Sequence, residues 1–197
     1  LVLLCLVVLN TSCKKYSAAT PAFYLKANNI SVVTTSTIQG SNSSKITELW
    51  LYLNGYYQGA YPIGSIIPIP NTNQNIKIDI LAGIKDNGFN TKRVPWPFYE
   101  KITFDTLIES GKTWALPIKF TYNPNTNFAW VEGFENSQGS TIVNSSFSSA
   151  TFATVTGAES FEGKSMKLEL TNAETIAQIE TALPYTLPLA NSNVYLE

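Results

Sequence analysis

The 197-residue sequence carries 13 basic and 14 acidic side chains, which give a formal net charge of −1, and it contains no histidine. This balance provides no basic footprint for nucleic acid and no strong field for steering charged partners. Histidine is the commonest general base and metal ligand, so its absence weighs against hydrolase and zinc chemistry. Hydrophobic residues make up 44% of the chain and charged residues 14%, a composition that can form a packed core and is typical of an extracytoplasmic β-protein.

The chain begins with an apolar run, Leu1 to Leu9, that is followed by Asn10-Thr11-Ser12 and then Cys13. A membrane-spanning helix needs about 20 apolar residues, so the run is too short for one, but it has the length of the apolar region of a signal peptide. Its junction with Cys13 resembles the lipobox of bacterial lipoproteins, in which the cysteine receives the lipid. We expect residues 1–12 to be a lipoprotein signal peptide and Cys13 to be the lipidation site. An ordinary signal peptide or another apolar segment is the alternative.

Two further expectations follow for the N-terminal region. A signal peptide starts with Met and a basic segment, so a chain that begins at Leu1 is expected to be truncated at this end. Residues 13–22 are mostly small and polar and include one proline, and they are predicted to form a tether between the lipid and the first strand. Buried acyl chains contribute about 0.8 kcal/mol per CH2 group, so several chains together would hold the protein at a membrane.

From residue 23 to residue 123 the apolar residues recur with a period of two, interrupted by turn signals. Strands are predicted near residues 23–35, 45–53, 56–61, 65–70, 75–81, 101–108 and 113–122. In the second of these, Ile46, Glu48, Trp50 and Tyr52 point to one side and the leucines between them to the other. Asn54-Gly55, a strong signal for a tight hairpin, follows directly. About seven short strands at this spacing predict a β-sandwich.

Five turn-forming residues, 123–127, mark the clearest boundary in the chain. After it, short strands are predicted at residues 146–155, 165–170 and 193–197, and a helix is predicted at 172–183, where Ile176, Ile179 and Leu183 share one face. Residues 128–197 are therefore expected to form part of a second β-domain. About 70 residues give only a small core, and the chain stops within a predicted strand, so we expect a truncation at this end too.

Several stretches carry a resemblance to a known family. ITELWLYLNGYYQGAY, ILAGIKDNG, the long stretch from VPWPFYE to FAWVEGFE, and GAESFEGKSMKLEL resemble a family of uncharacterised Bacteroidota outer-membrane lipoproteins. The resemblance implies an all-β protein, with an immunoglobulin-like or PEGA-like β-sandwich at residues 23–123 and an incomplete jelly-roll-like domain, similar to carbohydrate-binding modules, at 128–197. It implies an outer-membrane location, with the surface and periplasmic sides both open, and it implies no activity.

Two groups of aromatic residues are candidates for ligand binding. In Arg93–Glu100, the prolines could stiffen a loop that presents Trp96 and Tyr99 as a stacking platform for sugar rings, or they could mark an edge strand whose aromatic rings cover the core. Tyr56 and Tyr57, beside the predicted hairpin turn, pose the same choice between a ligand-facing loop tip and cross-strand pairs on a half-exposed sheet.

Three glutamates form the only candidate carboxylate cluster. Jelly-roll carbohydrate-binding modules often hold a structural Ca²⁺, and oxygen ligands suit this ion, so the resemblance makes Glu132 and Glu135 candidate calcium ligands, near Glu162. Solvated glutamates at strand ends are the alternative, and as a glycosidase pair these residues carry no signature. The sequence also has no G-x-S-x-G motif and no phosphate-binding loop.

These observations predict a protein without enzymatic activity and without a cofactor beyond the possible structural Ca²⁺. We expect a cell-envelope lipoprotein, anchored in the membrane by its lipid, that acts as a binding or scaffold module for a glycan or an envelope protein and has no nucleic-acid partner. The alternative is an adhesin-like or purely structural surface component. A more remote alternative is an accessory domain of a glycan-processing system.

Overall fold

The computed structural model describes residues 16, 18–70, 74–188 and 194–196. The predicted signal peptide, residues 1–12, and the predicted lipidation site, Cys13, lie outside the described residues. The described chain is all-β, as the sequence predicts: it forms twelve strands and three short 3-10 turns, and it contains no α-helix. Accordingly, nothing in the described part is a helix long and apolar enough to cross a bilayer.

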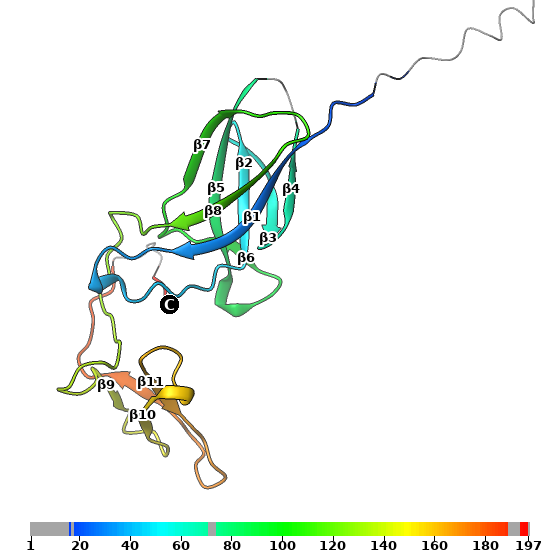
Figure 1. Ribbon diagram of the computed structural model, residues 1–197. Helices are drawn as coiled ribbons and strands as arrows, with labels where there is room; N and C mark the ends of the chain where they lie inside the picture. Colours follow the sequence, from blue (N-terminus) through cyan, green and yellow to red (C-terminus); the bar gives the residue numbers. More distant parts are fainter. Residues whose placement is uncertain (1–15, 17, 71–73, 189–193, 197) are drawn as a thin grey trace, which may run out of the picture. The chain divides into compact units, whose positions relative to one another are not determined.

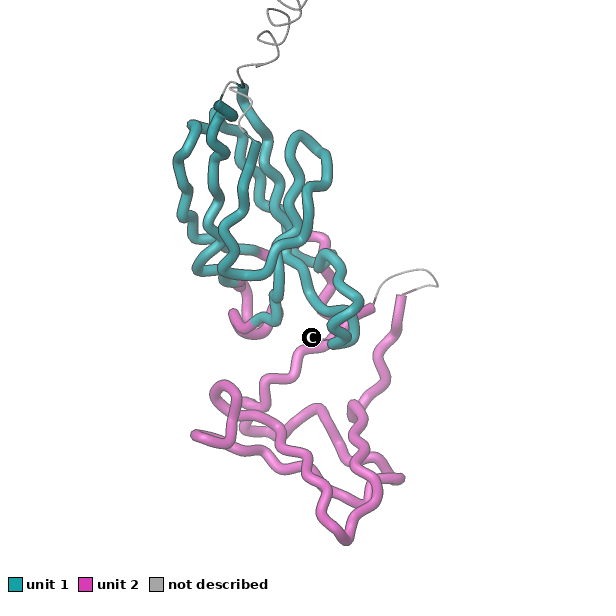
Figure 2. The backbone as a smooth tube through the Cα atoms, turned by 90° about the vertical axis from the view of Figure 1, so that its right-hand side faces the viewer, with its two compact units in different colours: residues 1–31, 44–120 teal, residues 32–43, 121–197 magenta. Residues whose placement is uncertain are grey.

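The chain divides into two compact units, residues 1–31 with 44–120 and residues 32–43 with 121–197 (Figure 2). The sequence-based boundary at residues 123–127 lies close to this division. However, the sequence pattern assigned all of residues 23–123 to one domain, whereas the loop 32–43 belongs to the second unit. This loop contains a 3-10 turn, Thr37–Gln39, that begins after the N-cap Ser36.

The first unit is a β-sandwich built from eight strands (Figure 1). These are β1 (Phe23–Val32), β2 (Glu48–Leu53), β3 (Tyr56–Pro62), β4 (Ile66–Ile69), β5 (Asn75–Lys85), β6 (Arg93–Pro95), β7 (Ile102–Leu107) and β8 (Thr113–Phe120). One sheet has the order β4-β1-β8. The other has the order β3-β2-β5-β6, and β7 pairs with β5 beyond the end of β6. The sandwich expected from the sequence is thus confirmed.

Alternating apolar side chains from both sheets fill the space between them. The buried residues of the larger sheet include Leu49, Leu51, Leu53, Ile76, Ile78, Ile80 and Ala82, and those of the smaller sheet include Phe23, Leu25, Ala27, Ile67, Ile69, Ile118 and Phe120. Because side chains alternate along a strand, the residues between the buried leucines of β2 lie on the outer face of the larger sheet. This outer face carries the site described below.

The turn between β2 and β3 fixes the register of these two strands. Asn54 and Gly55 both have positive φ, 49° and 83°, which is the backbone conformation of the tight hairpin predicted for this dipeptide. The Asn54 side chain also accepts a 2.9 Å hydrogen bond from the Lys77 backbone N–H, so the turn is attached to β5. The turn pairs Leu53 with Tyr56 and Tyr52 with Tyr57, and an irregularity between Leu51 and Tyr52 then shifts the pairing so that Leu51 lies opposite Gly59.

The second unit contains four short strands in two antiparallel pairs. These are β9 (Ile142–Asn144), β10 (Phe152–Thr156), β11 (Lys164–Leu168) and β12 (Ile179–Thr181), with β10 paired to β11 and β12 paired to β9. The strand predicted at 165–170 is therefore present, whereas only the end of the one predicted at 146–155 is. Residues 194–196 are not in a strand. Of the jelly-roll-like domain, the described residues establish its β-character only.

The helix predicted at residues 172–183 is wrong. Ser149 Oγ accepts hydrogen bonds from the backbone N–H groups of Thr175 and Ile176, both at 3.0 Å, and Ser148 Oγ accepts one from Gln178. Side chains distant in sequence thus bind the N–H groups that a helix would use internally. The segment instead runs extended into β12, where Ile179 pairs with Asn144.

Candidate functional site

An aromatic cluster lies on the outer face of the larger sheet. The ring centroid of Tyr57 on β3 is 5.2 Å from that of Trp50 and 5.4 Å from that of Tyr52, both on β2. We call the three rings, Trp50, Tyr52 and Tyr57, the aromatic face. Tyr57 is 51% exposed, and Trp50 and Tyr52 are half-buried, so Tyr57 is the ring most available to a ligand.

A buried carboxylate anchors this face. Glu48, also on β2, has no exposed surface; its Oε1 accepts a 3.0 Å hydrogen bond from Trp50 Nε1, and its Oε2 accepts one of 2.7 Å from Arg93 Nη1. A buried charge is tolerated only when it is paired and hydrogen-bonded, and both conditions are met here. The pair therefore fixes the orientation of the Trp50 indole against the sheet.

The close packing at Glu48 requires a glycine on the next strand. Gly83 pairs with Glu48 in the β2–β5 register. A Cβ atom at this position would lie 2.6 Å from Glu48 Cγ and 2.7 Å from Trp50 Cδ1, closer than real contacts allow. The absence of a side chain on Gly83 thus provides the space for the Glu48 and Trp50 side chains.

The surroundings of Tyr57 keep its hydroxyl protonated. Burial raises the pKa of Tyr57 above its ordinary value of 10.0, and Tyr52, the Glu48 carboxylate and Tyr61 raise it further. A negative charge on the phenol would lose part of its hydration and would be repelled by Glu48. The Tyr57 hydroxyl can therefore donate a hydrogen bond to a ligand at any physiological pH.

A second buried carboxylate with a charged partner lies on β5, two strands from β3, which carries Tyr57. Asp79 on β5 is buried, and its carboxylate accepts hydrogen bonds from Thr103 Oγ1 at 2.5 Å and from Lys101 Nζ at 3.2 Å. Burial is the largest single influence on the pKa of Asp79 and raises it, but the bonds from Thr103 and Lys101, with the charges of Lys101 and Lys77, together lower it below 3.8. This carboxylate thus stays ionised and paired.

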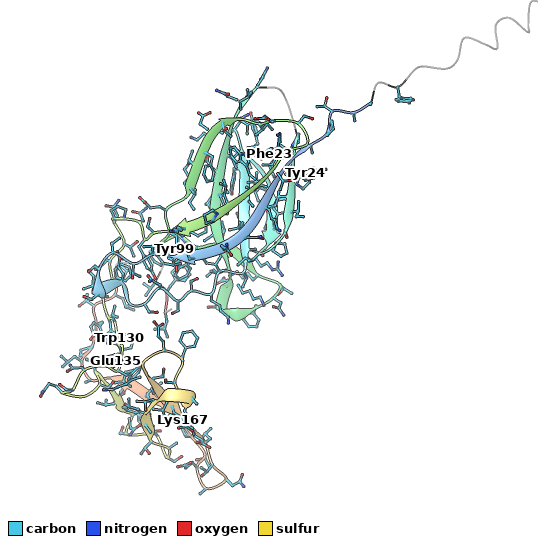
Figure 3. All side chains as sticks on the ribbon, viewed as in Figure 1. Phe23, Tyr24, Tyr99, Trp130, Glu135 and Lys167 are labelled. Carbon is cyan, nitrogen blue, oxygen red and sulfur yellow. The ribbon has the colours of Figure 1, made fainter. Side chains whose placement is uncertain are left out.

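The structure places the other predicted aromatic residues away from this face. Trp96 and Tyr99 are each only 7% exposed. The Trp96 ring lies 5.2 Å from Phe98 and 6.2 Å from Tyr99, and Tyr99 stacks on Phe120 at 6.1 Å. Tyr99 is found at the end of the sandwich opposite Phe23 (Figure 3). This burial contradicts a stacking platform for sugars at Trp96 and Tyr99 and supports the alternative, that the rings cover the core.

Tyr56 is 76% exposed, but its side chain lies on the other side of β3 from that of Tyr57. It pairs with Leu53, one of the buried leucines of β2. Of the two neighbouring tyrosines, only Tyr57 belongs to the aromatic face. Sequence reasoning identified Tyr57 but not Trp50, Glu48 or Arg93 as part of a site. The alternation along β2 was a signal for the first two, whereas the pairing with Arg93 depends on the fold.

The candidate calcium ligands have structural partners in the second unit. Glu132 Oε2 accepts hydrogen bonds from Thr141 N at 2.6 Å, Thr141 Oγ1 at 2.7 Å and Ser140 Oγ at 3.0 Å, and its Oε1 accepts one from Phe134 N at 2.7 Å. Burial raises the pKa of Glu132 most, but these bonds together outweigh it and lower the pKa below 4.5. We call this arrangement the Glu132 clamp; it joins the carboxylate to Phe134, Ser140 and Thr141 within the second unit.

Glu135 has a similar structural role. Its Oε1 accepts a hydrogen bond from the Lys164 backbone N–H at the start of β11; Glu135 and the neighbouring Trp130 are labelled in Figure 3. No group of three or more His, Cys, Asp or Glu side chains within the described ranges could hold a metal ion. The carboxylates of Glu132 and Glu135 are thus explained as acceptors for backbone and hydroxyl donors.

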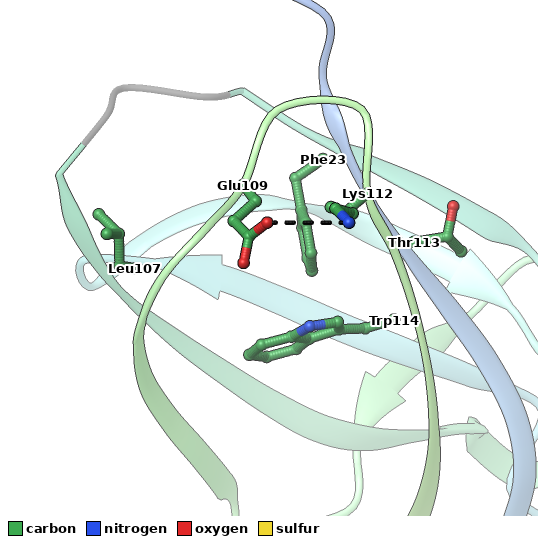
Figure 4. A pocket seen from close by; sticks show the side chains of 6 residues that line it. All are labelled: Phe23, Leu107, Glu109, Lys112, Thr113 and Trp114. Atoms are coloured by element: carbon green, nitrogen blue, oxygen red, sulfur yellow. Dashed lines mark ion pairs between the residues drawn. The ribbon is translucent and has the colours of Figure 1, made fainter.

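A small pocket lies between β1 and the β7–β8 turn (Figure 4). Its volume is about 150 Å³, and it is lined by Phe23 and Trp114, whose rings meet edge to face at 5.1 Å. Glu109 and Lys112, 4.0 Å apart, form an ion pair beside it. Ligand pockets usually have volumes of roughly 300–1,000 Å³, so this pocket is too small for a sugar or a cofactor.

Comparisons of the chain with protein-family models, with curated proteins and with solved structures found no match. The aromatic face therefore has to be interpreted from its own chemistry. Its features are an exposed tyrosine, two half-buried rings beside it, and two ion pairs within the sheet. Such a surface can stack on a ligand and donate hydrogen bonds to it.

Proposed function

We propose that this protein is a non-enzymatic lipoprotein of the cell envelope whose β-sandwich binds a ligand on the aromatic face. The observation that carries the binding function is the position of Tyr57, half exposed beside Trp50 and Tyr52. A large exposed ring on a preorganised support is the type of side chain that contributes most to recognition, since little conformational entropy is lost on binding.

The lipoprotein part of the proposal depends on the apolar run and lipobox-like sequence that end at Cys13. The β7–β8 turn supports it by holding the chain close to this point: Ser110 Oγ donates a 3.0 Å hydrogen bond to Pro21 O, and Gly111 N donates one of 3.1 Å to Ala22 O. Pro21 follows Cys13 by eight positions, at most roughly 29 Å of extended chain. A lipid on Cys13 would keep the sandwich next to the membrane.

Two experiments test the two parts separately. Metabolic labelling with a palmitate analogue should label the wild-type protein and leave Cys13→Ser unlabelled; label on the variant, or none on the wild type, would remove the lipoprotein assignment. For binding, a photo-crosslinking phenylalanine analogue is placed at position 57 or 56 in cells. We expect adducts of higher mass from position 57 and few from position 56. Equal yields at the two positions would contradict a binding function of the aromatic face and favour a purely structural component.

A further inference from the structure

We infer that the ligand of the aromatic face is an uncharged glycan chain, an inference that rests on the proposed binding function and adds the chemical class of the ligand. A pyranose ring presents C–H groups on its faces and hydroxyls around its rim. Aromatic rings carry negative potential on their faces, which attracts the polarised hydrogens of C–H groups. The exposed Tyr57 offers a ring for such stacking and a protonated hydroxyl for the sugar rim.

The charges on the outer face of the sheet argue for an uncharged ligand. The acidic residues of this face are Glu48, Asp79 and Asp105, and the basic ones are Lys77, Lys85, Arg93 and Lys101. Arg93 pairs with Glu48 and Lys101 pairs with Asp79, so opposite charges cancel locally. The four basic and three acidic side chains leave a surplus of one positive charge, whereas a nucleic acid or an acidic polysaccharide would require a larger surplus of cations.

The composition of the face also favours a glycan over a protein. The core of a protein interface is depleted of charged residues and is packed with apolar side chains. Here two ion pairs, Glu48–Arg93 and Asp79–Lys101, lie within the face, and the apolar surface is largely aromatic. The polar groups remain accessible in part, since the side chain of Arg93 is 44% exposed. Its remaining N–H groups can donate to sugar hydroxyls.

The dimensions of the face suit a chain of several sugars. Tyr57 on β3 and Arg93 on β6 are separated by three strand spacings, because the sheet order is β3-β2-β5-β6. At about 4.8 Å per spacing, the strip from the tyrosine to the arginine is about 14 Å wide. Tyr57 lies level with Asp79 and Arg93 lies level with Lys85, six residues apart along β5, so an oligosaccharide that contacts both would run obliquely across the strands.

The test uses the full chain purified in a detergent without a sugar headgroup. Calorimetric titrations are made with neutral hexasaccharides of cellulose, xylan, mannan and chitin, and with polygalacturonate and heparin as acidic probes. We expect at least one neutral probe to bind with a Kd of about 1 mM or tighter and neither acidic probe to bind. Tyr57→Ala should weaken the neutral probe about tenfold or more, Tyr57→Phe should weaken it less, and the matched variant Tyr56→Ala should bind like wild type.

Each other outcome overturns the inference. Binding of an acidic probe would show that the ligand is charged, and binding that survives Tyr57→Ala would place the glycan site elsewhere. If no neutral probe binds while the crosslinker at position 57 still forms adducts in cells, the aromatic face binds a ligand of another class, such as a protein. If position 57 forms no specific adduct, the proposed binding function fails as well. Tyr57 is half exposed, so its variants are expected to fold, and circular dichroism checks this.

Discussion

Trp50 Nε1 donates a 3.0 Å hydrogen bond to Oε1 of Glu48, a carboxylate with no exposed surface. The two side chains leave the same strand on the same face, and the indole covers the charge that holds it. This contact connects stability with binding: the buried carboxylate needs its donors, and the ring that supports Tyr57 is one of them. Variants around Glu48 should therefore change the stability of the sandwich and the order of the aromatic face together.

Removal of the arginine partner should destabilise the first unit. Arg93→Ala leaves the Glu48 carboxylate buried with one donor fewer, and breaking a buried ion pair on one side costs about 3 kcal/mol. Urea unfolding followed by tryptophan fluorescence measures the loss. Arg93→Lys keeps the charge but not the planar geometry of the guanidinium, so it should lie between Arg93→Ala and wild type. If Arg93→Ala lowered the free energy of unfolding by less than about 0.5 kcal/mol, water would be solvating the Glu48 carboxylate in place of the guanidinium.

Gly83→Ala should also destabilise the first unit. The new methyl group would meet Glu48 Cγ at 2.6 Å and Trp50 Cδ1 at 2.7 Å, and overpacking of this kind costs about 1–3 kcal/mol. Gly133→Ala is the matched control, because a Cβ atom there would have nothing within 4 Å. Thermal unfolding should show a lower Tm for Gly83→Ala and a nearly unchanged one for the control. Equal shifts in the two variants would contradict the packing argument.

Trp96→Ala tests whether this ring belongs to the core. The ring is 7% exposed and packs on Phe98 and Tyr99, so its removal should cost about 3–5 kcal/mol of stability. Unfolding in urea measures this cost. Tyr56→Ala, at a largely exposed ring, should change stability by less than about 0.5 kcal/mol. If Trp96→Ala were as harmless as Tyr56→Ala, the tryptophan would again be a candidate for ligand stacking.

The Glu132 clamp should make the second unit sensitive to acid. The folded-state pKa of Glu132 lies below its ordinary value of 4.5, so its contribution to stability is fully present above pH 4.5. The contribution is lost as the pH falls through the lowered folded-state pKa, where the carboxylate becomes protonated in the native state as well.

Glu132→Gln removes this titration. The variant should be less stable than wild type at pH 6, and the difference should shrink toward pH 3. Hydrogen exchange at the Phe134 and Thr141 amides measures the stability of the clamp directly, since both N–H groups donate to this carboxylate. A constant difference between the two proteins from pH 6 to pH 3 would show that the clamp does not depend on the charge.

The sequence alone determined seven of the eight strands of the sandwich, all but β6, and the side of the sheet on which Glu48, Trp50 and Tyr52 lie. The reason is local: successive side chains of a strand point to opposite faces, so a period of two separates the core from the outside without knowledge of any partner. Asn54-Gly55 also predicted its hairpin, because both residues tolerate positive φ. These properties are encoded within a few residues and need no tertiary contact.

The tertiary structure decided what the local pattern could not. Arg93 reaches Glu48 from 45 positions away, a pairing that the local pattern of neither strand indicates. Ser149, in a different strand connection, takes the N–H groups of Thr175 and Ile176 and turns an amphipathic pattern into extended chain. Each case depends on a hydrogen bond or ring contact between distant segments. Such contacts outweigh local preferences of a few tenths of a kcal/mol per residue, so only the folded chain reveals them.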